Sequence, residues 1–281
     1  MVTPLLATRR ITLFAALLVL AWGCGSGSDE LTKTPGTTNA ENLFTQGKTA
    51  YGKEDYLEAI RLFEEVRLQA PASPMAAEAT YLEAMARYNQ DLFAGSAVDF
   101  RAVRRNYPNS PFAARAQYMV GESYYQIAPR PELDQTYTLL ALTEFQNFLH
   151  DFPAATASPS PSSASTDSGN TGSSLTDSAQ MRIGEIRQKL AMKYFKSAQL
   201  YDKLEDVKSA AVYYQRVLDN YYDTKPAPES ELRLAEINSD RNKLDDARSE
   251  IDAFDTKYLS TATSDERNRA LKLHNKLQQN P

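Results

Sequence analysis

The sequence predicts an all-α fold, a right-handed superhelix of about five stacked helix pairs. Three observations lead to this prediction. Glycine is sparse, with 11 among 281 residues, while Ala, Leu, Glu, Lys and Arg are abundant. A pattern of small, aromatic and proline residues recurs at an offset of 37 residues. No run of alternating apolar and polar residues indicates a β-strand.

The first element is a predicted secretory signal peptide over residues 1–23. Arg9 and Arg10 form its positive head, and an apolar run of 12 residues ends at a small glycine. That run is too short to span a bilayer, which takes about 20 residues. Cys24, the only cysteine, follows directly and cannot form an intrachain disulfide. The stretch VLAWGCGSG resembles the lipobox of bacterial lipoproteins. This resemblance implies that Cys24 carries fatty acyl chains such as palmitate. The alternative is an ordinary cleaved signal peptide beside an incidental cysteine.

Residues 24–40 are predicted to form a flexible tether, because they are rich in Gly, Ser, Thr and Pro. Gly25 stands where lipoproteins kept in the inner membrane carry Asp. The resemblance therefore implies a lipid anchor in the cell outer membrane, on its periplasmic face. Without the signal peptide the chain has 29 basic and 36 acidic residues, a net charge of −7. This balance argues against a nucleic-acid partner, which requires concentrated positive charge.

Residues 41–152 are predicted to hold repeats one to three, each a helix A followed by a helix B. A small residue is followed twelve positions later by another and then by an aromatic, and a proline ends helix B. This is the tetratricopeptide pattern. The first two copies have Gly47, Ala59, Phe63 and Pro71, then Ala84, Ser96, Phe100 and Pro108. The third has Gly121, Ala141, Phe145 and Pro153, with eight extra residues between its helices.

Each repeat position has a physical reason. The two small residues face each other where helix A crosses helix B, and the aromatic is expected to fill the space toward the next pair. Ser73 and Ser110 follow the helix-ending prolines and are expected to cap the next helix, with Pro74 and Pro111 at its first position.

Residues 153–178 are predicted to be a disordered Ser/Pro-rich loop, because they hold one large apolar residue. Residues 179–281 are predicted to form repeats four and five and a capping helix. The fourth repeat has Ala198, Ala210 and Tyr214, and the fifth has Ala235, Ala247 and Ile251. The helix that begins near Thr176 is longer than a repeat needs, and we expect it to brace the two halves. A generic helical bundle with coincidental spacing is the alternative.

Together, the cysteine, the five repeats and several strings resemble the BamD (competence lipoprotein, ComL) family of outer membrane protein assembly factors. The strings are DQTYTLLALTEFQNFLHDFP, RNYPNSP and AAVYYQRVLDNY. The resemblance implies a lipoprotein subunit of the β-barrel assembly machinery that acts in protein insertion into the membrane. Its C-terminal repeats would dock the periplasmic domain of BamA beside other assembly-machinery lipoproteins. Its N-terminal repeats would receive the C-terminal peptides of unfolded outer membrane proteins.

A peptide-binding groove is predicted on the concave face, which helix A lines in tetratricopeptide arrays. Its exposed positions lie three residues before, one after and four after the small residue. Both outer positions are aromatic in repeats one to three, whereas repeat four has Phe195 with Asp202 and repeat five has Leu232 with Ser239. The resulting peptide-binding residues are Phe44 and Tyr51, Tyr81 and Tyr88, and Tyr118 and Tyr125. Aromatic side chains offer large contact area at low entropic cost. The alternative is that these side chains only pack against neighbouring helices.

No motif indicates an enzyme, a cofactor or a metal site. His150 and His274 are far apart and have no Cys or His at zinc-ligand spacing. His150 is expected to interact with a helix dipole, and Arg104 and Arg105 are expected to form a solvated helix end. A second, non-enzymatic hypothesis is a periplasmic repeat scaffold that coordinates envelope constriction or cell-wall synthesis. The absence of an N-terminal heptad pattern argues against it.

Overall fold

A computed structural model describes residues 35–153 and 175–279 of the chain. Within these ranges all regular structure is helical, and the fold-class prediction is confirmed. No described helix is both long enough and apolar enough to cross a bilayer. The predicted signal peptide, the lipidation site Cys24 and residues 154–174 of the predicted loop lie outside the described residues.

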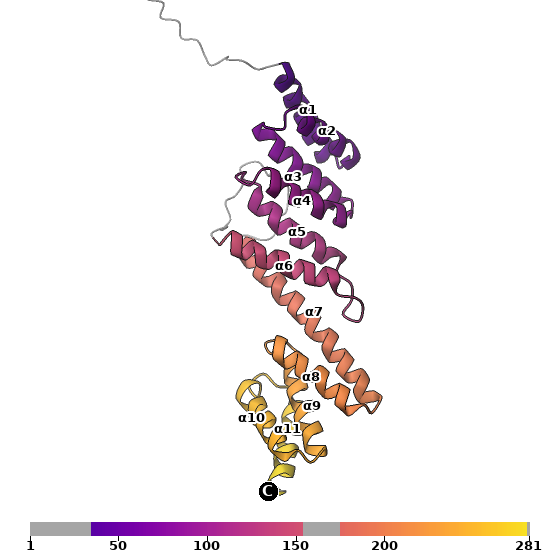
Figure 1. The fold of residues 1–281 in the computed structure, drawn as a ribbon, viewed down its shortest axis with the longest axis vertical. Helices are drawn as coiled ribbons and strands as arrows, with labels where there is room; N and C mark the ends of the chain where they lie inside the picture. Colours follow the sequence, from indigo (N-terminus) through magenta and orange to yellow (C-terminus); the bar gives the residue numbers. More distant parts are fainter. Residues whose placement is uncertain (1–34, 154–174, 280–281) are drawn as a thin grey trace, which may run out of the picture.

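The helix pairs stack along the long axis of the molecule (Figure 1). Repeats one to three consist of α1 (Pro35–Gly52) with α2 (Tyr56–Gln69), α3 (Pro74–Asn89) with α4 (Phe93–Asn106), and α5 (Ala113–Ile127) with α6 (Thr136–Asp151). Repeats four and five consist of α7 (Leu175–Lys203) with α8 (Val207–Tyr221), and α9 (Ala227–Asp240) with α10 (Leu244–Lys257). The capping helix is α11 (Ser264–Gln279).

The crossing of the two helices in a pair explains the small residues. A Cβ atom added to Gly47 would lie 2.7 Å from Cε1 of Phe63, and one added to Gly121 would lie 2.9 Å from the Phe145 ring. Both phenylalanines are fully buried. The aromatic of helix B therefore packs directly on the small residue of its own repeat, and not only toward the next pair as expected.

The turn between helix A and helix B also repeats. Glu54, Asp91, Glu205 and Asn242 all adopt the left-handed conformation, with φ between 59° and 63°. They occupy the same position in repeats one, two, four and five. The third repeat replaces this turn with the loop that the prolines in APRPELDQTYT predicted.

Some predicted boundaries are wrong. Helix α1 begins at Pro35, inside the predicted tether, because the fully buried Ala40 and the 2.7 Å hydrogen bond from Asn39 to Gln69 attach its first turns to α2. Helix α7 begins at Leu175, one residue from the start predicted near Thr176, although both lie inside the range given for the loop. Ser73 caps α3 as predicted.

The prediction for Ser110 is wrong. Helix α5 begins at Ala113 with Phe112 before it, so Pro111 does not stand at its first position. The Ser110 hydroxyl is buried without a hydrogen-bond partner.

Helix α7 has 29 residues and connects the two halves of the chain, as expected. Its N-terminal part packs on α5 and α6, and its C-terminal part pairs with α8 (Figure 1). Leu190 belongs to the apolar core of repeats two and three, whereas Ala191 belongs to the core that extends to α11.

Candidate peptide-binding groove

The predicted groove residues lie on the A-helix face, by which we mean the surface formed by α1, α3, α5 and the N-terminal part of α7. They form two columns. The first column lies three residues before the small residue of each repeat, and comprises Phe44, Tyr81 and Tyr118. The second column lies four residues after it, and comprises Tyr51, Tyr88 and Tyr125.

The first column packs against helix B. The rings of Phe44, Tyr81 and Tyr118 lie 6.0, 5.5 and 5.4 Å from the rings of Phe63, Phe100 and Phe145. Tyr81 also stacks on Phe112 and is only 6% exposed. Burial raises the pKa of Tyr81 and of Tyr118 to about 12. The expectation that Tyr81 is exposed to a ligand is therefore wrong, because its ring fills the core.

The first column continues beyond repeat three, so its large side chains do not distinguish the three N-terminal repeats from the others. Phe195 contacts Tyr214 at 5.9 Å in repeat four, edge to face. Leu232 is fully buried in the same core cluster as Phe254 in repeat five. A large apolar residue at this position is thus a packing requirement of every repeat.

The second column is only partly buried in repeats one and two. The Tyr51 ring lies edge-on to Tyr56 at 5.6 Å, and the Tyr88 ring lies edge-on to Phe93 at 5.1 Å. Tyr56 and Phe93 are the first residues of the two B helices, so each tyrosine ring packs on the helix B of its own repeat. The Tyr51 hydroxyl accepts a hydrogen bond of 2.9 Å from the Asn89 amide, which connects α1 to α3. Burial raises the pKa of both tyrosines, so their hydroxyls are neutral hydrogen-bonding groups at neutral pH.

Helix α7 contacts α5 on the A-helix face of repeat three. Arg182 donates two hydrogen bonds, of 2.9 and 3.0 Å, to the Glu122 carboxylate and one of 2.8 Å to Glu185. Its guanidinium also lies 4.5 Å from the centre of the Tyr125 ring, whose hydroxyl donates to Glu185 at 2.9 Å. Glu122 is only 6% exposed. Arg182 and Glu185 of α7 therefore hold Tyr125 on the A-helix face of repeat three, where it is partly buried like Tyr51 and Tyr88.

Sequence reasoning missed two residues of this face. Asn89 follows Tyr88 at the end of α3, so extending the pattern by one position would have found it. Arg182 lies 60 residues beyond Glu122, and no repeat period relates the two positions. Its contribution depends on where α7 packs.

The remaining candidates have intramolecular partners. His150 lies in the last turn of α6, where its Nδ1 is 2.9 Å from Asp151. The Nε2 of His274 lies 2.7 Å from Asp255. Arg104 is exposed, as predicted, and also contacts Gln117 at 2.6 Å and Asp151 at 3.2 Å. Among the described residues, no three His, Cys, Asp or Glu side chains group as metal ligands would.

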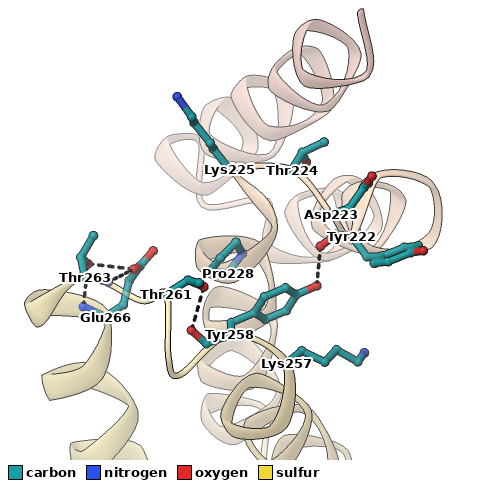
Figure 2. A pocket seen from close by; sticks show the side chains of 10 residues that line it. All are labelled: Tyr222, Asp223, Thr224, Lys225, Pro228, Lys257, Tyr258, Thr261, Thr263 and Glu266. Atoms are coloured by element: carbon teal, nitrogen blue, oxygen red, sulfur yellow. Dashed lines mark hydrogen bonds between the residues drawn. The ribbon is translucent and has the colours of Figure 1, made fainter. Parts of the chain in front are cut away.

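A separate pocket of about 780 Å³ lies where the α8–α9 and α10–α11 turns meet. Figure 2 shows that two of its hydroxyl groups donate to backbone oxygens of the pocket. The Tyr258 hydroxyl donates to the Tyr222 backbone oxygen at 2.9 Å, and the Thr261 hydroxyl donates to the Tyr258 backbone oxygen at 3.1 Å. Thr263 and Glu266 bond to each other at the start of α11. The lining includes neither His nor Cys and resembles no catalytic arrangement.

Comparison with known proteins identifies two families along the chain. The YfiO family, described as outer membrane lipoprotein, matches residues 37–159, and a tetratricopeptide repeat family matches residues 194–223. A search of curated protein sequences finds no match.

Several solved structures resemble the chain at low identity. MamA from Desulfovibrio magneticus RS-1 is 15% identical, with a TM-score of 0.34, over 80% of this chain and 97% of that one. The tetratricopeptide domain of P58(IPK) is 14% identical, with a TM-score of 0.42, over 86% and 67%. The TPR2AB domain of yeast Sti1, solved as a pHSP90 complex, is 10% identical, with a TM-score of 0.35, over 86% and 99%. At these identities and TM-scores, the similarity gives no information on the function of this chain.

The family match begins at the start of α1 and covers all three N-terminal repeats, which include the open tyrosines of the A-helix face. Residues 37–159 are therefore similar to the YfiO family of outer membrane lipoproteins, and residues 194–223 are similar to a tetratricopeptide repeat.

Proposed function

We propose that the chain is a non-enzymatic lipoprotein subunit of the β-barrel assembly machinery, anchored to the outer membrane through Cys24. In this proposal the C-terminal repeats scaffold BamA and the other assembly lipoproteins. The N-terminal repeats receive the C-terminal peptides of unfolded outer membrane proteins. The observation that carries the proposal is the match of residues 37–159 to an outer membrane lipoprotein family.

The open A-helix face of repeats one and two supports a peptide-binding role. Tyr51 and Tyr88 are fixed on one side by Tyr56 and Phe93, so their rings lose little side-chain entropy when a ligand packs on them. Their hydroxyls offer hydrogen bonds to an extended backbone. Barrel strands alternate apolar and polar residues and commonly end in an aromatic residue, which suits such a surface.

The whole assembly is tested by isolating the full chain from detergent-solubilised membranes and identifying its partners by mass spectrometry. We expect an outer membrane barrel subunit and further lipoproteins. Recovery of cell-wall synthases without a barrel protein would instead support the envelope-constriction scaffold.

The peptide-binding role is tested by Tyr51→Ala combined with Tyr88→Ala in the full chain. We expect weaker binding of a fluorescent peptide with a barrel strand's C-terminal sequence, by about 1 kcal/mol or more for each tyrosine that is a hot spot. Tyr222→Ala is the control, because Tyr222 is 60% exposed and lies at the α8–α9 turn, away from this face. Equal affinity of the double variant and the parent, with both folded, would assign these tyrosines to packing alone.

The anchor is tested by Cys24→Ser. We expect the variant to lose labelling by a fatty-acid probe and to leave the membrane fraction. Lipidation would be refuted if the parent chain took up no fatty-acid label and Cys24→Ser stayed in the membrane fraction.

A further inference from the structure

Ion pairs connect the A helices of neighbouring repeats along most of the molecule. Helices α1 and α3 are connected by Lys48–Glu78 at 3.0 Å, α5 and α7 by Glu122–Arg182 at 2.9 Å, α7 and α9 by Asp202–Arg233 at 2.9 Å, and α9 and α11 by Glu236–Arg269 at 2.9 Å. In each case the two residues lie on the faces that adjacent A helices present to one another.

The junction between α3 and α5 breaks this pattern. The repeat offset of 37 residues maps Lys48 onto Met85 and Glu78 onto Arg115. The position that should hold a charged partner for Arg115 is therefore a methionine, half-buried against the core. Arg115 is exposed, and its side chain forms no ion pair or hydrogen bond with any residue in ranges 35–153 and 175–279.

The repeat offset places Arg115 on the side of α5 that corresponds to the Glu78 side of α3, where Glu78 pairs with the preceding A helix. Burial raises the pKa of Tyr51 and of Tyr81, and Arg115 acts on both hydroxyls in the opposite direction, as a cation close to each ring does. Arg115 on α5 is thus near side chains from both α1 and α3. Asn89 adds an exposed amide that is bonded to the Tyr51 hydroxyl.

We propose that Arg115 binds the terminal α-carboxylate of an extended peptide lying on the A-helix face of repeats one and two. The peptide carboxylate provides the negative charge for Arg115 that an acidic side chain at position 85 would otherwise provide. This inference rests on the proposed peptide-binding function and adds the residue that selects a free C-terminus. Guanidinium and carboxylate groups match in shape and can form two parallel hydrogen bonds.

The surroundings favour a chain terminus over an internal acidic side chain. Tyr51, Met85 and Tyr88 offer half-buried apolar surface on the same A-helix face. A terminal residue presents its carboxylate and its side chain from one Cα atom, so it can pair with Arg115 and pack on these side chains together. An internal Asp or Glu uses its side chain for the charge and leaves the apolar surface to its neighbours.

The test uses the full chain and three synthetic fluorescent decapeptides with alternating apolar and polar residues. One ends in Phe with a free carboxylate, one ends in the same Phe as an amide, and one is the amide with an internal Glu. We expect the parent chain to bind the free acid about tenfold more tightly than either amide. Arg115→Gln should abolish this preference and leave the affinity for the plain amide unchanged. Arg105→Gln, an exposed arginine on α4, is the matched control and should keep the preference.

A second variant tests the missing counterion directly. Met85→Glu places an acid opposite Arg115 in the position that Lys48 occupies opposite Glu78. It should also abolish the preference for the free acid, with an unchanged helical circular dichroism spectrum.

The outcomes separate the two proposals. Equal binding of all three peptides by the parent chain overturns the role of Arg115 and leaves peptide binding intact. Tighter binding of the internal-Glu amide shows a preference for side-chain carboxylates and also overturns it. Failure of every peptide to bind the folded parent overturns the peptide-binding function itself, together with the inference.

Discussion

At the scale of single residues, two glycines in long helices have opposite roles. Gly47 lets α1 approach α2, whereas a Cβ atom added to Gly184 in α7 would meet nothing within 4 Å. We expect Gly47→Ala to lower the free energy of unfolding by about 1–2 kcal/mol, because the fully buried Phe63 must move. Gly184→Ala should raise it by up to ~1 kcal/mol through helix propensity alone. Urea denaturation of both variants checks this, and equal effects would contradict the close approach.

Glu250 is a second residue whose effect follows from its surroundings. Burial, together with the nearby Glu231 charge, raises its pKa to about 7, against the opposing effect of the hydrogen bonds from Asn238. The folded state therefore holds the proton more tightly than the unfolded state. Stability is lost as the pH rises from about 4.5 to about 7 and is constant above that range.

Glu250→Gln should remove this pH-dependent loss of stability, because the amide does not titrate. We expect the variant to be more stable than the parent by about 1–3 kcal/mol at pH 8, with little difference near pH 4.5. Thermal or urea unfolding at several pH values measures it. Asp245→Asn is the control, because the Asp245 side chain is 99% exposed. A constant difference across the pH range would show that Glu250 does not titrate as described.

At the scale of elements, α7 is held to α5 by Arg182. Removal of its guanidinium leaves Glu122 buried without its ion-pair partner. We expect Arg182→Ala to lower the free energy of unfolding by about 2–4 kcal/mol. Adding Glu122→Gln should restore part of the loss, because it removes the unpaired buried charge. Arg61→Ala, which breaks only exposed pairs within α2, should have little effect. No recovery in the double variant would mean that Arg182 acts through packing on Tyr125.

At the scale of the whole molecule, stability should be distributed along the array. Each helix contacts its sequence neighbours, and the two large apolar cores meet within α7, between Leu190 and Ala191. Arrays of this kind behave as a chain of nearest-neighbour interfaces. Local damage should therefore spread only a limited distance.

We expect Phe145→Ala to cost about 3–5 kcal/mol in repeats two and three. Hydrogen exchange should quicken in α3 to α6 and in the N-terminal part of α7 more than in α9 to α11. Phe254→Ala should give the reverse pattern. Uniform loss of protection in both variants would show that the array unfolds as a single cooperative unit.

Much of the fold could be predicted because its determinants are local. The spacing from Gly47 to Ala59 and Phe63 sets where helix A crosses helix B, and this spacing recurs in repeats two, four and five. Pro71 and Pro108 lie directly beyond the last turns of α2 and α4. The long helix after the Ser/Pro-rich segment was also predicted, because it shows continuous periodicity.

The candidate site was predicted less well, because exposure is a property of packing. The aromatic positions were found from the sequence, but a tyrosine that fills the core and one that lines a groove have the same periodicity. Tyr81 and Tyr88 lie on the same helix, and only the contacts of Tyr81 with Phe100 and Phe112 bury it.

The sequence by itself determined the helix pairs, their internal crossing and the columns of side chains that each A helix presents. The tertiary structure alone decided which columns stay open. More than twenty residues separate α6 from α7, so no local period relates Arg182 to Glu122. The packing of α7 on α5 brings Arg182 to Glu122 and Tyr125, and Met85 leaves Arg115 without an ion pair among the described residues. These outcomes depend on the relative positions of separate repeats, which sequence periodicity does not encode.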